Sequence, residues 1–409
     1  MAILLGATRG NLLQWGATVA MMENLKEKIA LRMSQSNSED GDAFLAELAE
    51  ELRAEMAFEE EFSANYAECL SALQSAVDNA ELAATFERFR RLAADYFLRR
   101  GSVISLHETC TQFQDLLLKR IFALAENWLV ESGIGLPATP HAWFGLGNSG
   151  RLEGNFSGDF KCLLVYEDNS PQDAPRFVGM CRRVAVILEE VGFRIGTGIN
   201  PINSQWRGSL NEWRRRVSDG FNSIDEQIHN LVILADMRQI HGDQGLGAAM
   251  LNLVRGMLEY HFEEIRGLAR GISRMPVGFD FFGRFRVEKE GEHQGEFNME
   301  RYAWLPLVNN VRVMAIRCNI HETSTLERIR KLQERGCVDV DLAERLLHAY
   351  HDTVGMMLRL QLGEMGGERY GFHFRPRDLD ERESERLKSA MEAVAALEII
   401  VYAAFAKQE

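Results

Sequence analysis

The sequence predicts a mainly helical α+β protein, in which a small mixed sheet lies between an N-terminal helical region and a C-terminal helical bundle. Three observations support this fold class. Apolar residues recur every three or four positions before residue 130. Strand-like segments alternate with helical ones in the middle of the chain. After Pro276, helix-start signals predominate.

The chain has 409 residues, more than one hydrophobic core usually serves. We expect an N-terminal helical region (1–104), a central sheet-bearing domain (105–275) and a C-terminal hairpin with a helical bundle (276–409). Acidic residues outnumber basic ones by 60 to 46, a formal charge of −14, which disfavours nucleic acid as a partner. The six cysteines show no C-x-x-C spacing. We therefore expect no zinc site, no disulfides and a cytoplasmic protein with reduced thiols.

The N-terminal region should be helical from residue 23 to about 100. The apolar segment before it lacks a basic stretch and contains Arg9 and Asn11, so we expect neither a signal peptide nor a membrane anchor. Asp78, with Glu81 three residues later, predicts a capping box at an internal helix start. A long amphipathic helix then runs from about Leu106 toward Gly133.

The sequence of the central region predicts alternating strands and helices. We expect a strand at 161–166, a helix at 176–190, a strand near 192–196 and a buried strand within 229–242. Trp206 and Trp213 are seven residues apart, so they should share one helix face as core anchors.

The C-terminal region begins with a predicted hairpin over 282–300. Its helices start at two predicted capping boxes, Ser324 with Glu327 and Asp380 with Glu383, and Gly336 is expected to end a helix.

The stretch "GLGNSGRLEGNFSGDFKCLLVYED" contains G-x-G-x-x-G at Gly145, Gly147 and Gly150. A dinucleotide fingerprint needs a crossover helix directly after the third glycine. No such helix fits, because Gly154 and Gly158 interrupt it and the next strand begins at 161. The glycines therefore serve a different loop.

A glycine turn after a strand, followed by a strand that opens with a carboxylate, is typical of polymerase-beta-like nucleotidyltransferases. The turn holds a triphosphate and the carboxylates hold magnesium against it. "GNSGRLEG" followed by "GDFK" resembles the G-S-x-G-R-x-E-Q and T-D-x-D motifs of one family. "NPINSQWRGSLNEW" and "ADMRQIHGD" resemble two later motifs of the same family. Its members are nucleotidyltransferases often fused to CBS or cyclic-nucleotide-binding domains. They are similar to the PII-protein uridylyltransferase and the glutamine synthetase adenylyltransferase. The resemblance covers residues 105 to about 405.

The resemblance implies a set of site residues. Asp159 and Asp236 would be the catalytic carboxylates and the ligands of Mg²⁺. The nucleotide would be bound by the turn and its flank, at Gly147, Asn148, Ser149, Arg151 and Glu153.

Two departures from the family pattern concern charge. Lys161 occupies the position of the second metal carboxylate, and an ammonium group cannot ligate magnesium. Glu300 occupies a position where the family has a lysine. We therefore expect a charge-swapped Lys161–Glu300 ion pair in the cleft. In the turn, Asn148 replaces serine and keeps hydrogen-bonding capacity.

Structural interpretations stay open beside these roles. If Asp159 is not a metal ligand, it is a turn residue at a strand edge. If Asp236 is not a metal ligand, it caps the end of its strand or pairs with Arg238. Arg151 and Glu153 are otherwise an internal ion pair that shapes the turn.

Two functions follow from the resemblance. The first is transfer of a nucleoside monophosphate from a nucleoside triphosphate to a protein or small-molecule hydroxyl, with Mg²⁺, at an activity weakened or lost through Lys161. The second is a catalytically degenerate regulatory protein that needs no metal and binds a nucleotide or a partner protein. Neither involves nucleic acid or a membrane, and a homo-oligomer is compatible with both.

Overall fold

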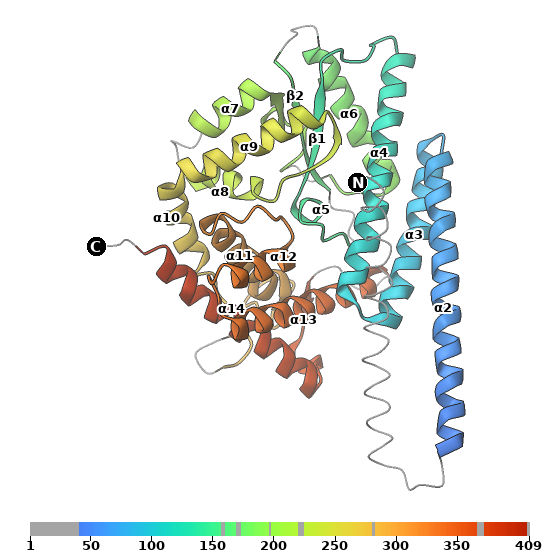
Figure 1. Ribbon diagram of the computed structural model, residues 1–409, viewed down its shortest axis with the longest axis vertical. Helices are drawn as coiled ribbons and strands as arrows, with labels where there is room; N and C mark the ends of the chain where they lie inside the picture. The colour runs from blue at the N-terminus through green and yellow to red at the C-terminus, as the bar shows by residue number, and fades with distance from the viewer. Residues whose placement is uncertain are drawn as a thin grey trace. The chain divides into compact units, whose positions relative to one another are not determined.

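The computed structural model describes residues 41–156, 160–168, 173–195, 198–219, 225–279, 283–365 and 372–406. The chain forms two compact units (Figure 1). Among the described residues, the first contains those up to Leu124 together with Gly154–Phe156 and Glu190–Gly192, and the second contains the others. The predicted boundaries at residues 104 and 275 stay predictions.

The first unit is helical, as expected. It contains α2 (Gly41–Ser75), α3 (Asn79–Arg100) and most of α4 (Val103–Glu131). Asp78 caps α3, because its side chain accepts a hydrogen bond from the Glu81 N–H at 2.9 Å. The rings of Phe89 and Phe113 stack 3.8 Å apart and join α3 to α4. The predicted helical segment 23–40 lies outside the described residues.

The second unit contains the predicted mixed sheet. Its strands are β1 (His141–Leu146), β2 (Lys161–Tyr166), β3 (Arg207–Ser209) and β4 (Arg238–Gly242), in the order β3-β2-β1-β4. β1 pairs antiparallel with both β2 and β4, whereas β2 and β3 are parallel. The strands that follow Asp159 and Asp236, β2 and β4, are not neighbours in this sheet, because β1 lies between them.

One strand prediction in this unit is wrong in part. Residues 225–234 form helix α8 (Asp225–Leu234), and only the end of the apolar run is strand β4. A short run of consecutive apolar residues has no periodicity that separates helix from strand. Arg194 forms a β-bridge within the predicted strand near 192–196, whose last residue lies outside the described ranges, and the strand that pairs with β2 on its outer side is β3.

Helices pack around this sheet. α6 (Ala174–Val191) confirms the predicted helix, and α7 (Leu210–Asp219) and α9 (Gln244–Tyr260) contact sheet strands. Trp206 and Trp213 are both buried, with ring centroids 6.3 Å apart. They are core anchors as predicted, but β3 separates them, so they do not share one helix.

The C-terminal part is a helical bundle with a two-stranded sheet. After α10 (Phe262–Ile272), a π-helical turn (Glu300–Trp304) leads into the bundle helices α11 (Leu305–Arg317), α12 (Thr325–Glu334), α13 (Val340–Met365) and α14 (Glu381–Ala404). The strand partner of β5 (Phe297–Asn298) is β6 (His373–Phe374), rather than a residue of the predicted hairpin.

The predicted helix signals of this region have different outcomes. Asp380 and Glu383 form the complete capping box of α14. The Ser324 side chain, in contrast, makes no capping hydrogen bond to α12. Gly336 follows α12 with φ +68°, the left-handed conformation that glycine tolerates, so it ends the helix as predicted.

The cysteine prediction needs a correction. Cys318 and Cys337 form a disulfide between the end of α11 and the segment after α12. Their separation of 19 residues follows no metal or redox motif, so spacing offered no signal. Cys69, Cys110, Cys162 and Cys181 are buried free thiols, as expected.

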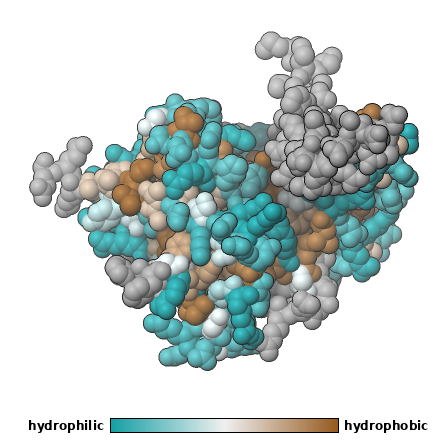
Figure 2. All heavy atoms as spheres, turned by 90° about the horizontal axis from the view of Figure 1, so that it is seen from below, coloured by the Kyte–Doolittle hydropathy of each residue, from teal (hydrophilic) through white to brown (hydrophobic). Residues whose placement is uncertain are grey.

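Hydrophilic side chains cover most of the face shown in Figure 2, with hydrophobic ones in small groups between them. This mixture is ordinary for globular proteins. Among the helices in the described ranges, none combines the length and apolar character required to cross a membrane.

Glu398 of α14 makes the stability of the bundle pH-dependent. Burial raises the pKa of its carboxyl from 4.5 to about 8, against a smaller lowering by a hydrogen bond to Asn310. The folded protein therefore holds a proton that the unfolded chain releases near pH 4.5. This contribution to stability is complete below pH 4.5 and is lost as the pH rises through 8.

We expect Glu398→Gln to remove this loss. The variant should be more stable than the wild type at pH 9 by about 1 kcal/mol, a discounted value because the side chain is partly solvated. At pH 5 this gain should be absent. Urea unfolding at both pH values measures it, with Glu392→Gln on the exposed face of α14 as the control. The same pH dependence in Glu398→Gln and wild type would contradict the assignment.

Candidate functional site

The glycine turn lies at the end of β1, where Gly147–Gly150 form the single turn α5. Gly147 has φ +59°, a conformation that favours glycine. A Cβ atom at Gly147 would lie 3.5 Å from Cδ of Lys161. The side chain of Lys161 therefore runs along the turn, opposite Leu146 in the β1–β2 register.

Gly150 is required for a different reason. A Cβ atom there would lie 2.1 Å from the backbone oxygen of Asp236, so only glycine fits. The turn thus packs directly on the segment before β4. Arg238 holds the same turn, because its Nε and Nη2 donate to the Ser149 carbonyl oxygen at 3.1 and 3.0 Å.

Gly150→Ala should destabilise the protein by about 2 kcal/mol, because the methyl group forces backbone apart in a packed region. Thermal or urea unfolding measures the loss. Gly256→Ala in α9 is a suitable control, since a Cβ atom there meets nothing within 4 Å and alanine favours helix. A Gly150→Ala protein as stable as the wild type would show that the turn can move away from Asp236.

Asp236 is the centre of a buried cluster of arginines. Its side chain is 0% exposed. Oδ1 accepts from Arg312 Nε at 3.0 Å and from Arg328 Nη1 at 2.6 Å. Oδ2 accepts from Arg312 Nη2 at 2.6 Å and from Arg151 Nη1 at 3.0 Å. Four hydrogen bonds occupy the roughly four acceptor positions of a carboxylate.

The charges in this cluster determine how Asp236 titrates. Burial by itself raises the pKa of the carboxyl, but Arg312, Arg328 and Arg151 outweigh it and hold the pKa of Asp236 well below its usual range. The same interactions with Glu153 and Asp236 raise the pKa of Arg151 despite burial. Asp236 and Arg151 are therefore both charged at neutral pH.

Arg151 connects the cluster to the glycine turn and to the C-terminal helices. Its Nε donates to Glu153 at 2.7 Å, and its Nη2 donates to Asn148 Oδ1 at 2.7 Å. Glu153 in turn accepts from the backbone N–H of Thr325 at 3.1 Å, at the start of α12. The Arg151 guanidinium lies 5.4 Å from the ring centre of Trp304.

Arg151 and Glu153 thus form the internal ion pair considered in the sequence analysis. Glu153 carries structural hydrogen bonds, and of the predicted nucleotide contacts Gly147, Asn148 and Ser149 remain on the turn itself. Asp236 also takes an ion-pair role, but its partners are Arg151, Arg312 and Arg328 rather than Arg238.

Magnesium does not fit the described residues. Asp159 lies outside them. The oxygens of Asp236 are already occupied by guanidinium groups, and Lys161 offers only donors. No cluster of three or more metal-ligating side chains occurs in the described ranges.

The Lys161–Glu300 hypothesis concerns two described residues. Lys161 is exposed at the start of β2, and Glu300 is half-buried at the start of the π-helical turn. Among the ion pairs between described residues, none joins these two. The charge-swapped pair stays a prediction.

Arg312 and Arg328 were missed by sequence reasoning. Arg312 stands within the apolar run "LVNNVRVMAI", and Arg328 precedes Ile329 on the buried face of α12. A charge inside an apolar run is a signal in itself, because arginine is rarely buried unless it is paired.

The comparisons with known proteins agree with this architecture. Residues 87–227 match a family model described as "Putative nucleotidyltransferase DUF294". Residues 263–405 match a second model, described as "Putative nucleotidyltransferase substrate binding domain". No curated protein matches the chain.

Proposed function

Because the chain belongs to the nucleotidyltransferase family whose two models match residues 87–227 and 263–405, we propose that it binds a nucleoside triphosphate while its metal-dependent transfer is weakened or lost. The observation that carries this proposal is the enclosure of Asp236 by Arg151, Arg312 and Arg328. A carboxylate whose oxygens already accept hydrogen bonds from three guanidinium groups is not available to a metal ion.

The turn supports the binding part of the proposal. Asn148 Oδ1 accepts from Arg151, so the amide group is oriented and its N–H donors are left for a phosphate oxygen. Backbone N–H groups of Gly147–Gly150 supply further donors of the kind that hold phosphates. Gly147 lets a phosphate approach the backbone closely.

Lys161 supports metal-independent binding. Its alkyl chain lies against Gly147, so its ammonium group is a cation beside the turn, in the position where the family has a metal ligand. Lysine is an effective point-charge partner for phosphate. We infer that Lys161 compensates part of the triphosphate charge in place of a metal ion.

The same substitution explains the weakened transfer. In two-metal phosphoryl and nucleotidyl transfer, the cations stabilise both the attacking and the leaving oxygen. A single ammonium group at the turn can attract phosphate, but it cannot activate an attacking hydroxyl as a bound metal does. Uridylyl or adenylyl transfer to a protein or small molecule would therefore be slow or absent.

The second candidate function is regulation, through a bound nucleotide or a partner protein. Two features together favour it: the glycine turn keeps groups that can donate hydrogen bonds to a phosphate, whereas Asp236 is held in ion pairs with three arginines. A cytoplasmic location is part of this proposal; the four buried free thiols favour it and the Cys318–Cys337 disulfide opposes it.

Titration with each nucleoside triphosphate, with magnesium and with EDTA, tests the proposal. We expect binding of similar affinity in both conditions and no release of pyrophosphate over hours with the triphosphate alone or with candidate acceptors. Binding that requires magnesium, together with rapid transfer, would establish a working enzyme. Absence of binding in both conditions would contradict the nucleotide site.

A further inference from the structure

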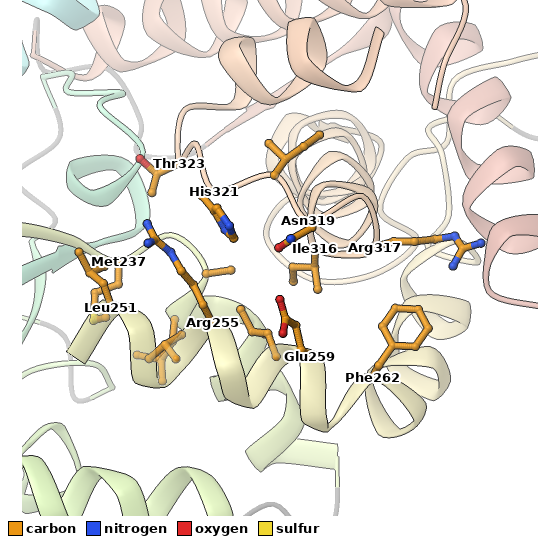
Figure 3. A pocket seen from close by; sticks show the side chains of 15 residues that line it. Met237, Leu251, Arg255, Glu259, Phe262, Ile316, Arg317, Asn319, His321 and Thr323 are labelled. Carbon is orange, nitrogen blue, oxygen red and sulfur yellow. The ribbon is translucent and has the colours of Figure 1, made fainter. Parts of the chain in front are cut away.

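Figure 3 shows a cavity of about 290 Å³, whose lining includes no residue of the glycine turn. One wall is α9, and the other consists of the end of α11 and the segment that follows it. Leu234, Ala235 and Met237 close the cavity beside Asp236. Much of the lining is apolar, including Leu251, Val254 and Ile320.

Two opposite charges line this cavity. Arg255 and Glu259 are four residues apart on α9 and project from the same helix face (Figure 3). Within the described residues, neither side chain forms an ion pair, with each other or elsewhere. Arg317 also lines the cavity, but it points away and stacks on Phe262 and Phe405.

The charges lie at different places along the cavity. Figure 3 shows the guanidinium of Arg255 on the side of His321 and Thr323, and the carboxylate of Glu259 on the side of Asn319. Burial lowers the pKa of His321, and among the two cavity charges Arg255 lowers it further whereas Glu259 raises it, so both charges act on this side chain. A ligand between these groups meets a cation, an anion and an apolar floor.

We propose that this cavity binds a small zwitterion, an α-amino acid with an apolar side chain. Its carboxylate would pair with Arg255, its ammonium with Glu259, and its side chain would lie on Leu251, Val254 and Ile320. Each ligand group then has a partner of matching chemistry, whereas a simple anion would leave Glu259 as a repulsive charge.

Size also favours a ligand of this class. Pockets for drug-sized molecules start at roughly 300 Å³, so a cavity of about 290 Å³ suits a small metabolite rather than a nucleoside triphosphate. The negative charge of Glu259 further disfavours a polyphosphate. The cavity is therefore separate in its chemistry from the proposed nucleotide site.

The cavity adjoins the arginine cluster. Arg328 donates from Nε to the carbonyl of Glu322 at 2.7 Å and from Nη2 to the carbonyl of Ala235 at 2.8 Å. Ala235, which accepts one of these hydrogen bonds, lines the cavity, and so does Thr323, which follows Glu322 in the chain. An occupant would thus rest on the segments that Arg328 connects to Asp236.

Calorimetric titration of the full chain with L-norleucine tests the proposal, with hexanoate and pentylamine as analogues that each lack one charge. We expect norleucine to bind at least tenfold more tightly than either analogue. Arg255→Gln should weaken norleucine binding at least tenfold. Glu259→Gln should weaken norleucine binding to a similar degree but leave hexanoate binding equal or stronger. Arg345→Gln, on α13 outside the cavity, is the matched control and should change neither.

Several results would overturn the proposal. These are no norleucine binding at millimolar concentration by a folded wild-type chain, hexanoate binding as tight as norleucine, or unchanged norleucine binding in both charge variants. The proposal does not rest on nucleotide binding. A triphosphate titration of the same preparation therefore separates a failure here from a failure of the nucleotide site.

Discussion

Asp236→Asn should destabilise the protein by about 3–5 kcal/mol, because the variant leaves buried arginine charges without their shared carboxylate. Arg312 and Arg328 are most affected, since each directs charged hydrogen bonds at Asp236. Asparagine keeps the size of the side chain, so the loss reports charge rather than a cavity. Urea unfolding near pH 7 measures it.

Asp243→Ala provides the control for this experiment. Asp243 is a carboxylate in the same part of the chain that caps α9, accepting from the Leu246 N–H at 2.7 Å. Its removal should cost about 1 kcal/mol, the usual value for a cap. If Asp236→Asn lowers stability no more than Asp243→Ala, the arginine cluster is not a major source of stability.

The pH dependence of the same variant supplies a second test. The arginines hold the pKa of Asp236 below its ordinary value of 3.8, so its contribution is present above the unfolded-state pKa and is lost as the pH falls through the folded-state pKa. The stability difference between wild type and Asp236→Asn should therefore be constant near neutrality and shrink below about pH 4. A magnesium ligand behaves differently: its replacement would lower metal-dependent nucleotide affinity with little effect on stability.

Lys161→Ala should weaken metal-independent triphosphate binding roughly 10- to 100-fold, the range expected for a charged hydrogen bond of about 1.5–3 kcal/mol. The ammonium group beside Gly147 is the cation that the variant removes from the turn. Because Lys161 is exposed, stability should change little. Fluorescence titration with a labelled triphosphate in EDTA measures the affinity.

Two further variants define the role of Lys161. Lys289→Ala removes another exposed lysine and should leave affinity unchanged, which excludes a general charge effect. Lys161→Asp restores the family residue type but should not restore transfer, because Asp236 remains enclosed by arginines. Magnesium-dependent transfer by Lys161→Asp would show that Asp236 is not required as a ligand. Unchanged triphosphate affinity in Lys161→Ala would remove Lys161 from the site.

The long helices were predictable because their signals are local. The apolar spacing of α4, the Asp380–Glu383 capping box and the stop at Gly336 each involve residues within a few turns. Short apolar segments were predicted less well. The run before β4 has apolar residues at consecutive positions, so no periodicity separated helix α8 from a strand.

The residues of the candidate site also differ in whether local sequence could predict their roles. The sequence by itself determined the glycine turn, through the order of strand, glycines and strand. It also determined the family, through motifs that occur in a fixed order. Only the tertiary structure decided the role of Asp236, since Arg312 and Arg328 lie 76 and 92 residues away in the chain. Whether a carboxylate binds a metal ion or a guanidinium group depends on which charges folding buries beside it. Pairs between residues so far apart in the chain leave no periodic pattern in the sequence.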